Sequence, residues 1–406
     1  MPTRRRFLHA AAGLSALSWL DSTSSAWGAR APGVQPSALI TGKSDELQVL
    51  TADPLVFESS LSSLDRHRVT PKELLFVRNN ANPEGMATVA APQMAHWKVE
   101  LTGLKTGASR IELSALREHA LTEVEMVLQC SGNGRSMFSR AAKTEGTQWG
   151  RGGIGNVVFG GVPLARVLEQ WGLEPSEPAR YVALEGYDAP AAGKANFEHS
   201  VPLEDAVERG MLALAMNGEP IPAVHGGPVR FVLPGYYGTV QIKWLSRMRF
   251  EPEESANEHH AKRYRTPHRL LKPGEEYHFD RANSTPTWKQ KIAALTTSHV
   301  DGQPVAAGER VIAGYAWNDG AAPLTQVLFS TDRGANWRRA ELDLAKSPYA
   351  WSRWRARTTI APGRNEVWIA ATDGLGRTQP LDGAIFWNPH GYEWNGVDRL
   401  TLTGMA

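Results

Sequence analysis

Cysteine is almost absent from this chain of 406 residues, in which Cys130 stands alone. A single cysteine cannot form an intrachain disulfide, so the sequence excludes a disulfide-stabilised scaffold. After the N-terminus, no apolar run reaches the roughly 18–20 residues that span a bilayer. The net charge is only +2 with histidine neutral, which does not indicate a nucleic-acid partner. These absences leave an ordinary globular composition with 42% hydrophobic and 21% charged residues.

Several motifs for cofactors and metals are missing as well. No GxGxxG follows a strand-like run, so nothing indicates a dinucleotide-binding fold. No CxxCH is present, which excludes covalently attached haem in this chain. Glu258, His259 and His260 lack the HExxH spacing of a zinc site, and we interpret them as part of a solvated loop.

The first thirty residues differ from the rest. "TRRRFLHAAAGLSALSWL" has a basic start and an apolar stretch over residues 10–20, and "STSSA" ends at Ala26 with small residues suited to cleavage. This pattern predicts a secretory signal over residues 1–29. Arg4 and Arg5, followed by Phe7 and Leu8, resemble a twin-arginine signal, which implies export to the bacterial periplasm.

The body of the chain predicts an extended arm and two domains. Residues 30–60 are turn-rich and are expected to form the arm. Residues 61–280 mix strand and helix patterns, which predicts an α+β domain. Within it we expect strands at 96–104, 123–130, 181–188 and, around a glycine turn, 227–252, and helices at 111–120, 162–173 and 203–222. The polar segment 254–279 reads as an exposed linker or lid.

Residues 281–406 have a different character. The runs "RVIAGYAWN", "TQVLFSTD", "WSRWRARTTI" and "NEVWIAATD" are strand-like and are separated by turn residues. Eight of the 14 tryptophans lie here, which suits an aromatic core. We expect an immunoglobulin-like β-sandwich.

Cys130 lies in "EVEMVLQCSGNGRSMF", residues 123–138, where an apolar strand gives way to a glycine-rich turn. The cysteine could be a buried small hydrophobe, a free thiol or a metal ligand. The turn can present backbone N–H groups to an anion, and Arg135 adds a fixed charge. We interpret this pattern as a metal centre that handles an oxyanion, with a thiol nucleophile as the alternative.

Five blocks in order carry a resemblance to a known family. They are "LLFVRNNANPEG" (74–85), "LQCSGNGR" (128–135), "QWGRGGIGNVVFGGVPLARVL" (148–168), "HGGPVRFVLPGYYGTVQIKWL" (225–245) and "IFWNPHGYEWNGVDRL" (385–400). Together they resemble the sulfite oxidase family of molybdenum enzymes, over about residues 60–400. The form closest in organisation is the haem-free molybdenum subunit of a bacterial periplasmic sulfite dehydrogenase.

The resemblance implies a molybdopterin domain over 61–280 and a dimerisation-type sandwich over 281–406. It also implies a molybdenum atom held by a pyranopterin and by the thiolate of Cys130. The cofactor-binding residues that it implies are Phe76, Val77, Arg78, Asn79, Asn80, Cys130, Asp188, Ser200, His225, Arg230, Gln241, Ile242 and Lys243. Arg230 and Lys243 would supply cations to the pterin phosphate, although Arg230 could also be a solvated residue on a strand.

Catalytic roles beside the substrate are implied for Arg78, Arg135, Tyr264 and Trp149. Two positions depart from the family pattern. Asn80 stands in place of a histidine, and His390 stands in place of an arginine. Both changes bear on substrate affinity and on its pH dependence.

The implied reaction is oxidation of the oxyanion sulfite to sulfate. Because no haem motif is present, the implied electron acceptor is a separate c-type cytochrome, with the chain as a homodimer or a heterodimer with a cytochrome subunit. The alternatives are the molybdenum subunit of a sulfane- or thiosulfate-oxidising complex and a methionine sulfoxide reductase, which lacks the sandwich. A non-enzymatic binding module built on the sandwich is the alternative from another class.

The twin-arginine hypothesis predicts a location. Because a receptor reads the arginine pair, replacing Arg4 and Arg5 with lysine should leave the protein in the cytoplasm. Cell fractionation and immunoblotting measure this, with the unsubstituted protein as the control. Normal periplasmic yield of the double variant would contradict the interpretation of residues 1–29.

Overall fold

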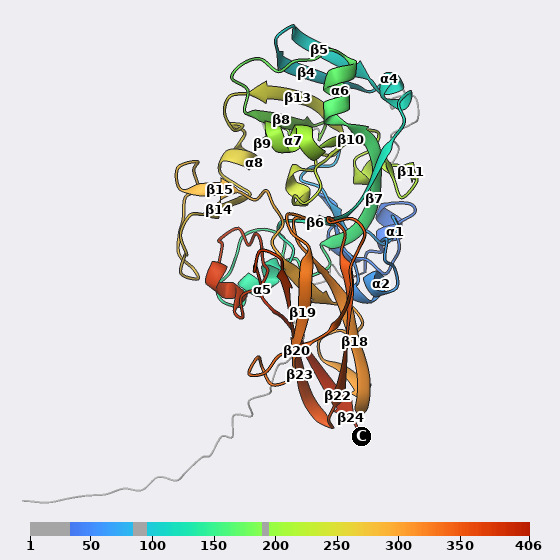
Figure 1. The fold of residues 1–406 in the computed structure, drawn as a ribbon, viewed down its shortest axis with the longest axis vertical. Coiled ribbons are helices and arrows are strands. Elements are labelled where there is room, and N and C mark those ends of the chain that lie inside the picture. The colour runs from blue at the N-terminus through green and yellow to red at the C-terminus, as the bar shows by residue number, and fades with distance from the viewer. Residues whose placement is uncertain (1–32, 84–95, 189–194) are drawn as a thin grey trace, which may run out of the picture.

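The structure has two parts arranged along its longest axis (Figure 1). It is a computed structural model, and it describes residues 33–83, 96–188 and 195–406. One part carries mixed sheets with short helices, and the other is a sandwich of two sheets. The predicted α+β domain followed by an immunoglobulin-like sandwich is therefore confirmed. The predicted signal lies outside the described residues.

A five-stranded sheet closes the end of the molecule farthest from the sandwich, in the order β5–β4–β13–β8–β9 (Figure 1). Only β4 and β13 run parallel, and the other neighbours are antiparallel. Its strands are β4 (Lys98–Leu104), β5 (Gly107–Glu112), β8 (Tyr181–Gly186), β9 (Glu198–Pro202) and β13 (Leu245–Glu251).

A second sheet has the order β11–β10–β7–β6, and β12 also pairs with β10. It leads directly to the predicted cysteine turn, because β6 ends one residue before Cys130. The strands are β6 (Thr122–Gln129), β7 (Ile154–Pro163), β10 (Met211–Met216), β11 (Glu219–Pro220) and β12 (Arg230–Val232).

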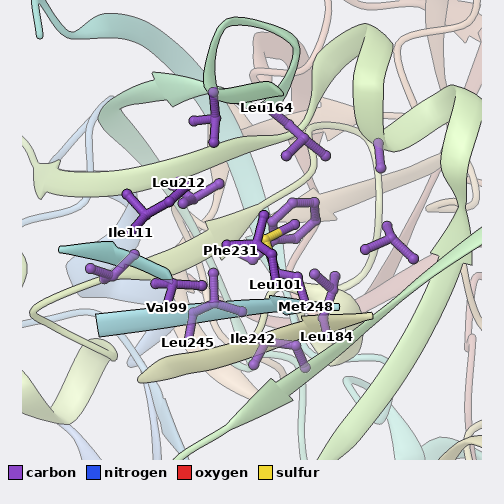
Figure 2. Close-up of a cluster of buried hydrophobic side chains, with 14 of the residues drawn as sticks. Val99, Leu101, Ile111, Leu164, Leu184, Leu212, Phe231, Ile242, Leu245 and Met248 are labelled. Atoms are coloured by element: carbon purple, nitrogen blue, oxygen red, sulfur yellow. The ribbon is translucent and has the colours of Figure 1, made fainter. Parts of the chain in front are cut away.

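The largest hydrophobic cluster joins these two sheets (Figure 2). Leu212 and Phe231 come from the second sheet, and Leu101, Leu184 and Met248 come from the first; all are buried. Burying such side chains contributes roughly 1.5–3 kcal/mol each. Three short helices cover the cluster, α4 (Leu113–Arg117), α6 (Leu164–Gln170) and α7 (Leu203–Arg209). The sheets are thus held rigidly where their strand ends carry functional residues.

Two sequence expectations in this part are wrong. The helix expected over 203–222 ends at Arg209, and an apolar strand, β10, follows, since "MLALAM" packs between β7 and β12. The segment 254–279, expected as an exposed linker or lid, is exposed over 268–270 and 272–274 but buries His260 and Arg265 completely. Arg265 donates to the His260 carbonyl (3.1 Å), and both side chains contact Glu254. The short elements here are α8 (Glu258–Ala261), β14 (Arg265–Pro267) and β15 (Ser284–Pro286).

The expected arm at 30–60 is also corrected, because its strands join a sheet. β2 pairs with β3, which follows later in the chain and carries Arg78. The elements are α1 (Pro36–Leu39), β1 (Gln48–Thr51), β2 (Val56–Glu58), α2 (Leu61–Asp65) and β3 (Val77–Arg78). This sheet therefore belongs to the body that holds the candidate site.

The sandwich packs a four-stranded sheet, β16–β18–β22–β21, against a five-stranded one, β17–β24–β23–β19–β20. Trp354 is fully buried between them, as the aromatic content predicted. The strands are β16 (Ala293–Thr296), β17 (Gln303–Ala306), β18 (Gly308–Trp317), β19 (Leu324–Ser330), β20 (Arg338–Arg339), β21 (Glu341–Asp343), β22 (Ser352–Ile360), β23 (Gly363–Asp373) and β24 (Asp398–Met405), with η4 (Gly383–Phe386) before β24. Among the described residues, no helix has the length and apolarity to cross a membrane.

Glu58 gives a prediction about stability. Its buried carboxylate accepts hydrogen bonds from the backbone N–H groups of Gly150 (3.1 Å) and Gly152 (2.6 Å). Burial raises the pKa of Glu58 from 4.5 to about 7. The folded state therefore holds this proton to higher pH than the unfolded state, and ionisation between about pH 4.5 and 7 costs stability.

Glu58→Gln removes this titration. The free energy of unfolding of the variant should rise relative to the wild type as pH increases from 4.5 to 7, by at most about 3 kcal/mol. Urea unfolding at several pH values measures the difference. Parallel pH profiles for the two proteins would show that the Glu58 proton is not linked to folding.

Candidate active site

A cavity lies where β3, β6, β12 and the turns after them meet. It contains about 690 Å³ of space not occupied by protein atoms, part of it open to solvent. Eleven of the residues implied by the family resemblance line it, namely Phe76, Arg78, Asn80, Cys130, Asp188, His225, Arg230, Gln241, Ile242, Lys243 and Tyr264. These residues are spread over nearly 190 positions of the sequence, and folding brings them to one wall.

The Cys130 turn is fixed from both sides. The Cys130 N–H donates to the carbonyl of Gly153 (2.8 Å), and its own carbonyl accepts from Asn133 N–H (2.9 Å). The side chain of Asn133 accepts from Gly153 N–H (3.0 Å), which ties the turn to the loop before β7. Gly134 has φ +85°, and a Cβ there would lie 2.7 Å from Trp394, so this position requires glycine.

The thiol of Cys130 is buried and faces a positively charged neighbour. Burial raises its pKa, while the guanidinium groups of Arg78 and Arg135 act in the opposite direction. Arg78 donates to Oδ1 of Asn80 (2.6 Å) and to Oη of Tyr264 (3.4 Å). The thiol and the Arg78 guanidinium therefore share one wall, where a soft ligand stands beside an anion-binding group.

Two further cations, Arg230 and Lys243, line the same cavity. Arg230 donates to the His225 carbonyl (2.8 Å), and Lys243 donates to the Val224 carbonyl (3.0 Å) and to Oδ1 of Asn79. Burial lowers the pKa of Arg230 to about 9 and lowers that of Lys243 well below its usual value. In the described part of the chain, no carboxylate lies within 4 Å of the charged nitrogens of Arg78, Arg230 or Lys243. Buried charges that lack such partners are costly, so this wall favours an anion.

Two polar atoms on this wall have no hydrogen-bond partner among the described residues. They are Nε of Arg230 and Oε1 of Gln241, both buried. Buried polar groups are normally paired, and an unpaired group costs about 1–3 kcal/mol. One cavity thus holds a charged hydrogen-bond donor and an acceptor without partners among the described residues. This indicates a ligand that carries both an anionic group and a hydrogen-bond donor.

A fourth cation comes from the N-terminal segment. Nζ of Lys43 lies 2.9 Å from Nε2 of His225 and donates to the carbonyl of Leu75 (2.7 Å). Burial lowers the pKa of Lys43 to about 7 and that of His225 well below its usual value. Lys43 thus holds the ring of His225 from behind the cavity wall. No periodicity or motif in the sequence indicates a role for this lysine.

Tyr264 also lines the cavity. Its hydroxyl donates to Oδ1 of Asn80 (3.3 Å), and its ring stacks on Tyr392 at 4.7 Å between centroids. Its backbone has φ +46°, which is unusual for a bulky residue and needs support from its surroundings. Tyr264 and Arg78 therefore both contact the amide of Asn80.

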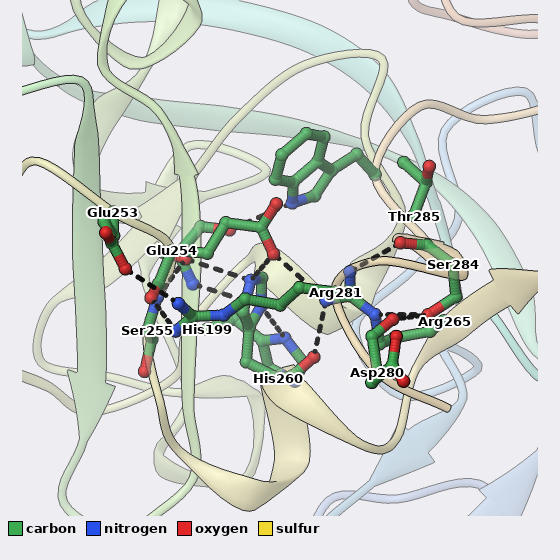
Figure 3. Close-up of polar contacts among 12 residues, drawn as sticks. His199, Glu253, Glu254, Ser255, His260, Arg265, Asp280, Arg281, Ser284 and Thr285 are labelled. Carbon is green, nitrogen blue, oxygen red and sulfur yellow. Dashed lines mark hydrogen bonds and ion pairs between the residues drawn. The ribbon is translucent and has the colours of Figure 1, made fainter. Parts of the chain in front are cut away.

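A buried polar network holds the segment that leads to Tyr264 (Figure 3). Nε2 of His260 lies 3.2 Å from Glu254 and 3.0 Å from Oγ of Ser200, and Nδ1 lies 3.1 Å from Nδ1 of His199. Arg265 donates to Glu254 (3.0 Å). The network spans both sides of Tyr264 in sequence, so it fixes where that ring lies.

Five of the implied residues do not line the cavity. Ser200 belongs to the network just described. Val77 is buried in β3, and Asn79 accepts from Lys243. Trp149 is fully buried and packs edge-on against Phe76, at 5.9 Å between centroids. Arg135 donates to the carbonyls of His390 and Thr147, both at 2.8 Å, so its guanidinium binds backbone and lies outside the lining.

Four lining residues were not expected from the sequence. They are Leu128, Phe197, Gly238 and Thr239. Phe197 lies in the connection before β9, and its N–H donates to Asp188 (3.1 Å). Burial raises the pKa of Asp188, whereas Lys243 lowers it. In the sequence, Phe197 is marked only by the strand that follows it. A strand pattern predicts local structure and does not indicate a functional residue.

The chain is similar to known proteins over most of its length. The model of the oxidoreductase molybdopterin-binding domain matches residues 86–259, and that of the molybdenum-cofactor oxidoreductase dimerisation domain matches residues 285–401. Chicken (Gallus gallus) sulfite oxidase is 30% identical over 356 residues, which cover 85% of this chain and 75% of that protein. The chain belongs to the sulfite oxidase family.

Other members extend the comparison. Human (Homo sapiens) mitochondrial sulfite oxidase is 30% identical over 371 residues, covering 87% of this chain, and the chain spans 65% of the length of that relative. The crystal structure of the sulfane dehydrogenase SoxCD from Paracoccus pantotrophus has a TM-score of 0.74 at 23% identity, covering 95% of this chain and 94% of that one. This second likeness concerns the fold.

As a member of the sulfite oxidase family, the chain carries a molybdenum–molybdopterin cofactor. The residues present fit this group. The thiol of Cys130 is a soft ligand suited to molybdenum, and Arg230 and Lys243 offer unpaired charge to a phosphate. The open atoms of Arg230 and Gln241 match the polar groups of a pterin.

Arg230 therefore gives a prediction about cofactor content. Arg230→Gln keeps a hydrogen-bond donor and removes the charge, which should weaken pterin binding about ten- to a hundredfold, since charged hydrogen bonds contribute roughly 1.5–3 kcal/mol. The measurement is pterin and molybdenum content per mole of purified protein. The exposed Arg180, changed to Gln, is the matched control. Full cofactor content in the folded Arg230→Gln variant would place the phosphate elsewhere.

Proposed function

We propose that this protein is a sulfite dehydrogenase of the bacterial periplasm, which oxidises sulfite to sulfate and passes electrons to a c-type cytochrome. The observation that carries the proposal is the unpaired charge of Arg78 beside the thiol of Cys130 in a largely buried cavity. Sulfite and sulfate are small oxyanions, and they match that charge and the room above the thiol. Sulfite oxidases among the relatives support the substrate class.

The chain's own residues bind and orient the substrate. Asn80 accepts from Arg78 and from Tyr264, so it presents the guanidinium and the phenol toward the same space. The bound cofactor supplies a two-electron redox couple. Arg78 then stabilises negative charge on sulfite and on the product in a site of low dielectric constant. Tyr264 can donate its hydroxyl proton in a hydrogen bond to an oxyanion oxygen.

Asn80 also sets the pH behaviour of the proposed site. An amide does not change its charge near neutral pH, whereas a histidine at that position would. Sulfite affinity should therefore lack a titration from this position. Arg78 stays charged throughout, because Tyr264 and Cys130 raise its pKa despite the opposing effect of burial.

The proposal also assigns a role to each group of site residues and gives the bounds of the two domains. We assign catalysis to Arg78 and Tyr264 and cofactor binding to the other lining residues. Arg135 and Trp149 support the cavity wall from behind, since Arg135 binds backbone carbonyls and Trp149 packs against Phe76. Residues 61–280 form the catalytic domain, and residues 281–406 form the dimerisation-type domain, consistent with the family models. Export follows from the twin-arginine pattern at residues 1–29.

A second candidate substrate is sulfane sulfur. The observation in its favour is the fold shared with the sulfane dehydrogenase SoxCD over nearly the whole chain. Assaying purified protein with sulfite and with thiosulfate, and with cytochrome c as the acceptor, separates the two functions. Turnover with neither substrate would overturn the sulfur assignment.

Arg78→Gln should raise the KM for sulfite about ten- to a hundredfold, because a charge-assisted hydrogen bond is lost. The measurement is sulfite-dependent cytochrome c reduction, normalised to molybdenum content because Arg78 also lines the cofactor cavity. The exposed Arg117, changed to Gln, is the control. An unchanged KM in molybdenum-replete Arg78→Gln protein would remove Arg78 from the substrate site.

A further inference from the structure

Five aromatic rings form a continuous series away from the cavity. Tyr264 stacks on Tyr392, with ring centroids 4.7 Å apart and 20° between the planes. Tyr392 contacts His390 at 5.8 Å, His390 contacts Phe279 at 4.9 Å, and Phe279 contacts Tyr277 at 5.0 Å. The series begins at the cavity wall and ends at a half-buried ring, so it links the candidate active site to the surface.

The inner part of the series is rigid. Tyr392 is buried, and the guanidinium carbon of Arg135 lies 5.1 Å from the centre of its ring. The same guanidinium donates to the carbonyl of His390 (2.8 Å). Arg135 therefore holds two successive rings while donating to Thr147 as well. These contacts explain why the guanidinium of Arg135 lies outside the cavity lining.

The outer part of the series forms one wall of a surface depression. Tyr277, Phe279 and His390 line it together with Trp387, and it contains about 1430 Å³ of space open to solvent. Charges of both signs surround the rings. The remaining charged lining residues are Lys143, Glu145, Glu258, Lys262, Arg263, Glu275, Glu276 and His278. An aromatic centre with a mixed charged rim is typical of a protein-binding surface.

We propose that this depression, the electron-exit surface, docks a small haem protein and that the ring series is the route by which electrons leave the cofactor. The inference rests on the proposed function. Sulfite and water give sulfate, two protons and two electrons, and two ferric haems each accept one electron to become ferrous. Two partners must bind and leave in each turnover, which favours a small surface steered by charge.

The geometry favours this route because electron transfer slows steeply with distance through protein. Successive ring centroids from Tyr264 to Tyr277 are no more than 5.8 Å apart, and the outer three rings line the surface depression. Tyr277 is also fixed, since its hydroxyl donates to the Asn283 carbonyl (2.8 Å). Because the Tyr277 ring is ordered, its distance to the edge of a docked haem would be constant.

The test uses the holoenzyme and a small soluble cytochrome c. The enzyme is reduced first with sulfite and, separately, with dithionite, so that the exit is measured whether or not sulfite is the substrate. Stopped-flow absorbance then follows cytochrome reduction in Tyr277→Leu and Phe279→Leu. We expect a tenfold or greater loss in both, while bleaching of the oxidised cofactor by sulfite keeps its rate. Trp337→Leu, in a half-buried ring of the sandwich, is the matched control and should change neither.

A binding readout accompanies the kinetics. Hydroxyl-radical footprinting of the unsubstituted enzyme should show protection of Tyr277 and His278 when cytochrome c is added. Wild-type rates of cytochrome reduction in both variants, or a footprint that leaves Tyr277 unprotected, would overturn the proposal. Slower bleaching by sulfite in the variants would instead assign the depression to substrate entry. Failure of sulfite to bleach the unsubstituted enzyme, with dithionite-driven reduction intact, would count against the proposed function alone.

Discussion

Buried positive charge without matching negative charge is the constraint on which the site depends. Arg78, Arg230 and Lys243 lie around one cavity, and among the described residues Asp188 is the only carboxylate in its lining. Taking cations out of water costs several kcal/mol each unless an anion meets them. The lowered pKa values of Arg230 and Lys243 express that cost. A cofactor with a phosphate offsets it, and the proposed oxyanion substrate would do the same, so binding and local stability are coupled.

The fold keeps these cations in place by fixing backbone rather than by pairing charges. Arg78, Arg135, Arg230 and Lys243 each donate to a backbone carbonyl, and none of these contacts neutralises the charge. Neutral acceptors hold a cation in position and leave its field available to a ligand. The turn at Cys130 follows the same principle, since backbone bonds to Gly153 and the side chain of Asn133 fix it.

Much of this arrangement could be predicted from the sequence, and the part that could not is instructive. The apolar run before Cys130 and the five ordered blocks located strand ends that line the candidate cavity, because local pattern determines those elements. Lys43, Phe197 and Tyr392 were not anticipated as neighbours of the site. Lys43 and Phe197 lie outside the five blocks, and Tyr392 lies in the last block, far from Cys130 in the sequence. Their places beside the site depend on packing between distant segments, on which local pattern carries no information. The helix expected over 203–222 failed for a related reason. The run "MLALAM" has no distinctive period, and its pairing with β7 and β12 decides its strand conformation.

The segment 387–395 joins the sandwich to the part of the molecule that holds the candidate site. It precedes β24 of the sandwich, yet Glu393 N–H donates to the Ser131 carbonyl (2.8 Å), one residue after Cys130. Trp394 occupies the space that a Cβ on Gly134 would need, and Asn388 donates to the Arg265 carbonyl (2.9 Å) next to Tyr264. The sandwich connection thus contacts both the cysteine turn and the tyrosine segment. Movement of the sandwich relative to the sheets would displace Tyr392 from Tyr264 and Arg135 together. The ring contacts and the position of the Cys130 thiol therefore depend on the same interdomain packing. A change at that junction would affect the cofactor site and, with it, the proposed substrate site and electron exit.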